Sequence, residues 1–138
     1  MHSLLRLGCV VGFRLRCHGR SQLPEEGAVL VCSNHQSYLD PVIVGVSFNE
    51  SMNFLARKTL FRSPIFGWAI AYLDAIPIDR DGMSLEGIKE TLRRLKRGER
   101  VVMFPEGTRS EDGRLREIKP GICALARRGK AAILPVAL

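Results

Sequence analysis

Short apolar runs alternate along the chain with longer segments whose apolar residues recur at helical spacing. Apolar runs bounded by turn residues predict strands, and apolar positions spaced by three and four residues predict helices. The clearest helical segment places Leu85, Ile88, Leu92 and Leu95 on one face. Strands are predicted at 28–33, 52–56, 75–78, 100–104 and 131–136, and helices at 40–48, 63–73, 84–97 and 120–128.

This alternation predicts an α/β fold, a largely parallel mixed central sheet flanked by helices. Local signals predict where several elements begin and end. Asp40 before Pro41 predicts a helix N-cap followed by proline at the first helical position. Gly98 and Gly129 predict the ends of two helices. The segment 23–27 predicts a turn into the first strand.

Charged side chains follow three of the predicted strands directly. They are His35, Arg80 and Glu106. Ligands of parallel sheets bind beyond the carboxyl ends of the strands, so we expect these residues to converge on one site.

The most informative stretch is Asn34–Asp40, which separates an imidazole from a carboxylate by five positions. A histidine acts as a general base near neutral pH, and a carboxylate can fix its tautomer and stabilise its charged form. Five residues of continuous helix rotate by roughly 500°, which would leave the two side chains on different faces. His35 and Asp40 can therefore meet only if the chain turns between them. The plainer interpretation, a turn histidine and a helix cap without chemistry, stays open at this point.

Composition indicates one globular domain. The chain has 138 residues, of which 46% are hydrophobic and 25% charged, and no repeat or low-complexity tract interrupts it. Its formal net charge of +7 suits nucleic acid, an anionic membrane surface or phosphorylated small molecules. The basic residues are scattered, and no zinc finger or RNA-binding signature accompanies them, so nucleic acid is not expected as a partner.

The four cysteines, Cys9, Cys17, Cys32 and Cys123, show neither C-x-x-C spacing nor a metal-site pattern. They are typical of reduced thiols in a cytoplasmic protein, and we expect no metal. Cys32 lies two residues before Asn34, but a strand residue facing the core explains it better than a nucleophile does.

Residues 1–22 form a short amphipathic segment ahead of a domain predicted to run from 23 to 138. Its apolar stretch is far shorter than the about 20 residues that span a bilayer. Insertion into a membrane interface and packing as a first helix both remain open. The aromatic residues Phe61, Phe66 and Trp68 are interpreted either as core or as membrane or acyl-chain contacts.

Four ordered blocks resemble the motifs of the glycerolipid acyltransferases, the 1-acylglycerol-3-phosphate (lysophosphatidate) O-acyltransferase family. The resemblance covers about 23–138, and the third block is its most specific part. The blocks are Asn34-His35-x4-Asp40, Ile76-Pro77-Ile78-Asp79-Arg80, Phe104-Pro105-Glu106-Gly107-Thr108-Arg109-Ser110 and Ile133-Leu134-Pro135-Val136.

The resemblance implies acyl transfer from a thioester to the hydroxyl of a lysophospholipid. His35 would be the general base and Asp40 the residue that orients it. The substrate-binding residues would be Arg80, Glu106, Gly107, Thr108 and Arg109. Arg80 is our first choice for the acceptor phosphate, Arg109 the second and Lys119 a weaker third. Glu106 is expected to accept a glycerol hydroxyl hydrogen bond or to hold an arginine, and the Gly107 N–H to stabilise the oxyanion.

The expected partners are a lysophospholipid acceptor, acyl-CoA or acyl carrier protein as donor, and an anionic membrane surface on the cytoplasmic face, with peripheral attachment. The alternatives are an acceptor derived from another lysophospholipid or an amino acid, and a non-catalytic lipid- or phosphate-binding remnant. The sequence contains no G-x-G-x-x-G motif, which disfavours a nucleotide-binding Rossmann protein. Family members continue beyond the fourth block, so we expect this sequence to be truncated at its C-terminus.

Overall fold

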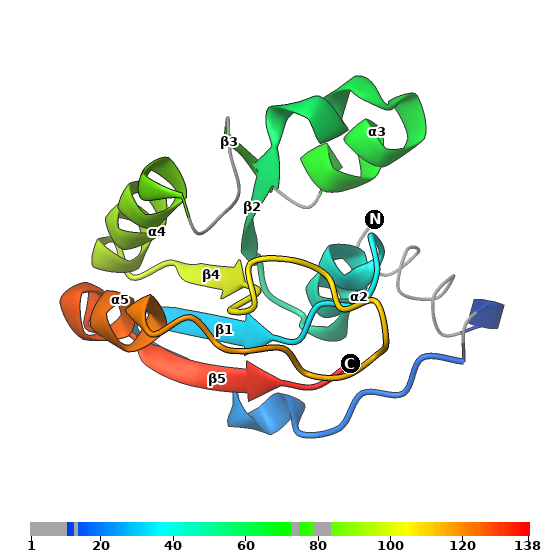
Figure 1. Ribbon diagram of the computed structural model, residues 1–138. Helices are drawn as coiled ribbons and strands as arrows, with labels where there is room; N and C mark the ends of the chain where they lie inside the picture. The colour runs from blue at the N-terminus through cyan, green and yellow to red at the C-terminus, as the bar shows by residue number, and fades with distance from the viewer. Residues whose placement is uncertain (1–10, 13, 73–74, 79–83) are drawn as a thin grey trace.

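A five-stranded parallel sheet forms the centre of the molecule in the computed structural model, which describes residues 11–12, 14–72, 75–78 and 84–138 (Figure 1). The strand order is β3-β2-β4-β1-β5, and each pairing among these strands is parallel. The strands are β1 (Val29–Ser33), β2 (Asn53–Arg57), β3 (Ala75–Ile78), β4 (Arg100–Met103) and β5 (Ala132–Val136). The predicted sheet is confirmed, with strand ends that differ from the prediction by at most one residue.

Helices connect successive strands, as the alternating pattern predicted. They are α2 (Asp40–Ser47), α3 (Pro64–Tyr72), α4 (Leu85–Lys96) and α5 (Gly121–Gly129), with short 3₁₀ helices η1 (Arg20–Gln22) and η2 (Lys58–Arg62). Figure 1 shows α3 beyond the β2 and β3 end of the sheet and α5 beside β5 and β1.

Both faces of the sheet are covered at its central strands β1 and β4, which are apolar on both sides, whereas the edge strand β5 is largely exposed. Successive residues of β1 point to opposite faces. Val29 and Val31 pack with Val44 of α2 and Ile70 of α3. Leu30 packs on the other face, in a cluster that draws on α4 and α5. The strand therefore ends between two packed layers, and His35 follows two residues later at a fixed place.

The start of α2 differs from the prediction by one residue. Leu39 occupies the N-cap position and Asp40 is already the first helical residue. The Asp40 carboxylate does not cap the helix, because it accepts hydrogen bonds from residues before the helix: the ring of His35 and the backbone N–H groups of Gln36 and Ser37. The aspartate that we predicted as a helix cap is therefore turned back toward the histidine.

Gly129 also differs from its prediction as a helix stop. It is the last residue of α5, and Lys130 after it takes the left-handed conformation with φ of 51°. A Cβ atom on Gly129 would lie 2.7 Å from Cβ of Leu95 in α4. The glycine therefore allows α4 and α5 to approach closely.

Two predictions about the N-terminal and aromatic residues have different outcomes. Residues 1–10 and 13 of the amphipathic segment lie outside the described residues, as does the side chain of Phe66. Trp68 is 58% exposed, so the core interpretation is wrong for it, whereas Phe61 packs against the core. No helix in the described part of the chain is long and apolar enough to cross a membrane.

Replacing Gly129 by alanine is expected to destabilise the protein, although alanine is the better helix former. Overpacking a close contact costs about 1–3 kcal/mol, which outweighs a helix-propensity gain of up to about 1 kcal/mol. We expect urea denaturation to show a lower free energy of unfolding for Gly129→Ala. Gly121→Ala at the other end of α5 is the control, because nothing lies within 4 Å of its added Cβ. Equal stabilities of the two variants would contradict the close contact.

Candidate active site

His35 and Asp40 meet because the chain turns between β1 and α2. His35 Nδ1 lies 2.8 Å from Asp40 Oδ2. The same Oδ2 accepts the backbone N–H of Gln36 at 2.5 Å and of Ser37 at 2.7 Å. A carboxylate oxygen that accepts three hydrogen bonds leaves Nδ1 as the donor, so Nε2 is the ring nitrogen with a free lone pair. The predicted turn and pairing are confirmed.

The pair is shielded from solvent to different degrees. The Asp40 side chain is almost fully buried and that of His35 is 19% exposed. The imidazole stacks on the ring of Phe104, with ring centroids 4.1 Å apart and an interplanar angle of 21°. The stack and the Asp40 bond together fix the plane and the rotation of the imidazole, while one edge stays open to the outside.

Glu106 holds the backbone of His35. Its Oε1 accepts the His35 N–H at 2.8 Å, and its Oε2 accepts the Arg116 N–H at 2.8 Å. The side chain is buried, with 4% of the residue exposed, and it does not line the cleft described below. Both carboxylate oxygens of Glu106 thus bind backbone N–H groups, and its expected contact with a glycerol hydroxyl or an arginine side chain stays a prediction. The Ser110 N–H completes the arrangement by donating to the His35 carbonyl at 2.7 Å.

Gly107 takes a positive φ of 73°, which favours glycine. Its N–H donates to the Phe104 carbonyl at 3.0 Å, so this turn already uses the group that we expected to face an oxyanion. A Cβ atom here would lie 2.9 Å from Lys119 Nζ. The absence of a side chain thus lets the Lys119 ammonium approach the backbone of the third block.

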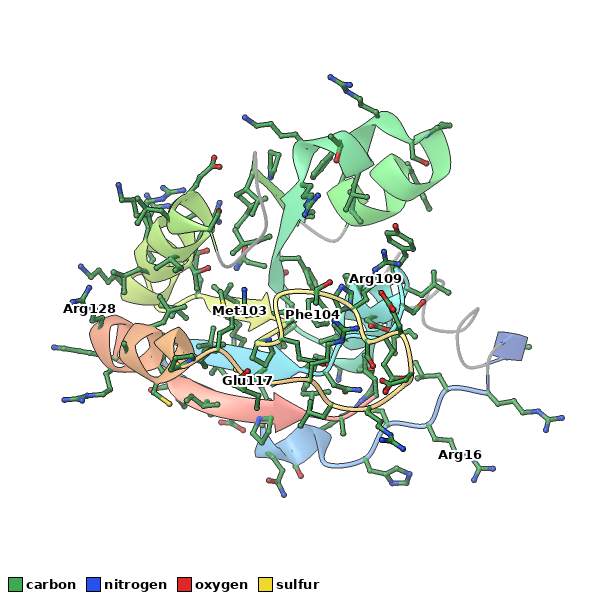
Figure 2. The ribbon with its side chains drawn as sticks, viewed as in Figure 1. Arg16, Met103, Phe104, Arg109, Glu117 and Arg128 are labelled. Carbon is green, nitrogen blue, oxygen red and sulfur yellow. The ribbon has the colours of Figure 1, made fainter. Side chains whose placement is uncertain are left out.

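A cleft of about 440 Å³ opens beside this pair. Polar and charged groups from the two loops lie along part of it, and apolar side chains of β2, η2, α3 and β4 form the rest. Its lining includes His35, Tyr38, Gly107, Thr108 and Arg109, with Phe54, Leu55, Leu60, Ile70, Met103 and Phe104 as apolar surface. Figure 2 shows Phe104 and Arg109 toward the carboxyl ends of β4 and β1, whereas Arg128 lies at the opposite end of the molecule.

Family comparison agrees with this geometry. The model of the Acyltransferase family matches residues 14–138, which is most of the chain. The chain belongs to this acyltransferase family.

Individual relatives give the same result. The chain is 36% identical over 129 residues to the chloroplastic 1-acyl-sn-glycerol-3-phosphate acyltransferase LPAT1 of Arabidopsis thaliana, covering 91% of this chain and 36% of that protein. It is 34% identical to the 1-acyl-sn-glycerol-3-phosphate acyltransferase of Streptococcus pneumoniae, and the match covers 86% of this chain and 45% of that protein. The crystal structure of the 1-acyl-sn-glycerophosphate acyltransferase PlsC from Thermotoga maritima superimposes on this chain with a TM-score of 0.75 at 25% sequence identity. The superposition covers 97% of this chain and 56% of that protein. The chain thus spans between 36% and 56% of the length of these relatives.

Arg80, our first choice for the phosphate, lies outside the described residues. The strand before it, β3, is separated from β1 by β2 and β4. Three strand spacings place the ends of β3 and β1 roughly 14 Å apart. The proximity of Arg80 to His35 and its role in binding the acceptor phosphate stay predictions.

Sequence reasoning missed two side chains of the site. Phe104 was assigned to a strand, but it supplies the stacking surface for His35. Tyr38 was given no role, but the guanidinium of Arg109 packs over its ring, with Arg109 Cζ 3.6 Å from the ring centroid. Tyr38 lies in the first motif block and Phe104 begins the third. The presence of an aromatic residue in a block with charged residues was the signal that could have identified both.

Cys32 is poorly suited to act as a nucleophile near neutral pH. Burial, together with a smaller effect of the nearby Cys123, raises the pKa of its thiol to about 11. The thiolate is the reactive form, and it is scarce far below the pKa. Cys32 packs against the core cluster beneath α4 and α5, as predicted. The described residues include no group of three potential metal ligands among His, Cys, Asp and Glu side chains.

The Glu106→Gln variant is expected to lose both stability and acyl transfer. The amide nitrogen would face one of the two backbone N–H groups that now donate to Glu106, and leaving a buried N–H unpaired costs about 1–3 kcal/mol. Urea denaturation and the rate of acyl transfer measure the two losses. Glu111→Gln, the same change at an exposed position of the loop, is the control. If the two variants have the same stability and rate, Glu106 does not position His35.

Proposed function

We propose that this chain carries the catalytic centre of an acyltransferase that moves a fatty acyl group from an acyl thioester to the free hydroxyl of a lysophospholipid. The preferred acceptor is 1-acylglycerol 3-phosphate, which would become phosphatidic acid. The observation that supports this most is the His35–Asp40 pair, whose aspartate is buried and whose imidazole lines a partly apolar cleft that Arg109 also lines. The relatives compared above are acyltransferases that act on 1-acylglycerol 3-phosphate.

The geometry suits direct attack by the acceptor, without an acyl-enzyme intermediate. Nε2 of His35 would take the proton of the acceptor hydroxyl as its oxygen adds to the thioester carbonyl. The tetrahedral intermediate then collapses, the C–S bond breaks, and the leaving thiolate receives the proton from the imidazolium. Asp40 stabilises the imidazolium through its bond to Nδ1. Because the acceptor supplies the nucleophilic oxygen, the enzyme needs none, which fits the protonated thiol of Cys32.

The cleft separates the binding tasks. Its apolar lining from Phe54, Leu60 and Ile70 would hold an acyl chain, which gains free energy by leaving water. Arg109, at the polar part of the lining, would bind the acceptor phosphate through its fork of N–H donors. Gly107 and Thr108 line the same part, so their contact with substrate is part of the proposal, together with that of Arg80. Acyl-CoA and acyl carrier protein both supply the required thioester.

Removing the base or its partner is expected to abolish most acyl transfer. General base catalysis contributes on the order of 10²–10⁴-fold, so His35→Ala should lower kcat by about that factor. Asp40→Asn, which places an amide where three donors converge, should also lower kcat by at least about tenfold. His18→Ala is the control, because His18 is exposed. Wild-type kcat in both the His35 and the Asp40 variants would exclude this mechanism.

Peripheral attachment to an anionic membrane at the cytoplasmic face is part of the proposal. The α3 segment from Pro64 to Tyr72 has no charged residue, and its Trp68 is exposed. It contacts η2, where Lys58 and Arg62 are exposed. Tryptophan prefers the membrane interface, and lysine and arginine are attracted to anionic lipids. This surface borders the cleft through Leu60 and Ile70.

Trp68→Ser is expected to weaken binding to vesicles that contain anionic lipid, because the exposed indole would no longer insert into the interface. Cosedimentation with vesicles of phosphatidylcholine and phosphatidylglycerol measures this loss. Leu85→Ser removes a similarly exposed apolar side chain at the start of α4 and should keep the wild-type affinity. Equal affinities for the Trp68 and Leu85 variants would reject α3 as the docking surface.

A further inference from the structure

We infer that Tyr38 is a positioning residue that holds Arg109 ready for a phosphate group and thereby sets the preference of the enzyme for a phosphate-monoester acceptor. The inference rests on the acyl transfer proposed above and concerns the selectivity of the same site. It assigns a role to a side chain within the Asn34–Asp40 turn other than the base and its partner.

The two side chains form a cation–π pair. Arg109 Cζ lies 3.6 Å from the centroid of the Tyr38 ring. Tyr38 is 52% exposed and Arg109 is half-buried, and both line the cleft that contains His35. A guanidinium whose carbon lies over the face of an aromatic ring makes the contact without using its N–H donors as hydrogen-bond donors to a carboxylate. Its N–H groups point outward in the plane, so they remain free to bind two oxygens of a phosphate.

The charge of Arg109 is not neutralised by a carboxylate in the described part of the chain, where no ion pair involves it. Of the acids nearest to Arg109 along the chain, Glu111 is exposed and forms no ion pair with Arg109 in the described part, and the other two are engaged elsewhere. Glu106 accepts two backbone N–H groups, and Asp112 accepts the Ser110 hydroxyl and the Arg114 N–H. A half-buried guanidinium beside a cleft, held by a neutral ring, is therefore a site for an anion.

Both partners of the pair are anchored to His35. Tyr38 belongs to the turn whose N–H groups at Gln36 and Ser37 bind Asp40. Arg109 precedes Ser110, whose N–H donates to the His35 carbonyl at 2.7 Å. The phosphate-binding cation and the general base are thus tied to one short segment. An acceptor held by its phosphate at Arg109 would have its glycerol portion beside the imidazole.

Loss of the ring should therefore affect phosphate recognition and spare the base. The long side chain of Arg109 would sample several rotamers, and ordering it again would weaken acceptor binding. The expected signature is a higher KM for a phosphate-bearing acceptor with little change in kcat. An acceptor that lacks the phosphate gains nothing from Arg109 and should not respond.

The test compares Tyr38→Leu with Tyr38→Phe, using 1-acylglycerol 3-phosphate and the monoacylglycerol of the same chain length. Tyr38→Leu should raise KM for the phosphate acceptor roughly two- to thirtyfold, the range of a cation–π contact, and leave monoacylglycerol turnover unchanged. Tyr38→Phe keeps the aromatic face and should restore most of the affinity. Leu39→Ala, at the neighbouring exposed position, is the control for disturbance of the turn. An equal loss for both acceptors, or no change in KM, would overturn the inference.

A double-mutant cycle shows whether Tyr38 acts through Arg109. Arg109→Gln should raise KM for the phosphate acceptor, and adding Tyr38→Leu to it should have no further effect. Additive effects of the two substitutions on KM would mean that Tyr38 acts independently of the guanidinium.

The phosphate could also belong to a coenzyme A donor. The same assays with an acyl N-acetylcysteamine thioester, which carries no phosphate, distinguish the two sources. A Tyr38→Leu effect that persists with this donor assigns the site to the acceptor, and an effect that disappears assigns it to the donor and rejects acceptor selection.

Calorimetric binding of a short-chain 1-acylglycerol 3-phosphate to the same variants needs no turnover. The order of affinities expected is wild type, then Tyr38→Phe close to it, then Tyr38→Leu. Binding in this order without acyl transfer would reject the proposed reaction and support the role of Tyr38. Acyl transfer together with equal binding affinity for all three proteins would support the proposed reaction and reject the role of Tyr38.

Discussion

The arrangement of the site depends on one carboxylate oxygen, Oδ2 of Asp40. It accepts hydrogen bonds from Nδ1 of His35 and from the backbone N–H groups of Gln36 and Ser37. These residues reverse the chain between β1 and α2. A buried carboxylate must have its charge compensated by such donors. The same three bonds therefore stabilise the aspartate, fix the tautomer of the histidine and close the turn that presents Tyr38.

The parallel sheet supplies the second half of the site at the adjacent strand end. Because β4 pairs directly with β1, the loop after β4 begins beside the loop after β1. Glu106 and Ser110 from that loop bind the N–H and the carbonyl of His35. The general base proposed here is thus fixed by its backbone as well as by its side chain. Such preorganisation allows a weakly acidic hydroxyl to be deprotonated without movement of the base.

Binding and chemistry share these supports. The cleft draws its apolar lining from β2, η2 and α3 and its polar lining from the two loops that hold His35. The stack of Arg109 on Tyr38 crosses between these loops. His35 and Arg109, the base and the phosphate-binding residue proposed above, are therefore held by the same two loops.

Local sequence determined much of this protein. The alternation of apolar runs and amphipathic segments set the strands, the helices and the parallel sheet, because hydrophobic periodicity follows backbone geometry. The spacing of His35 and Asp40 required a turn, and the turn is there. Only the tertiary structure decided the strand order, which places β4 beside β1 and β3 at the edge, since strand pairing is not encoded in any local period. It also decided that the Asp40 carboxylate turns away from its helix and that Glu106 binds backbone N–H groups. The close approach of Gly129 to the Leu95 side chain, which leaves no room for a Cβ atom, was likewise decided by the tertiary structure. These are contacts between segments distant along the chain or choices among several partners within reach, and residue types alone do not specify them.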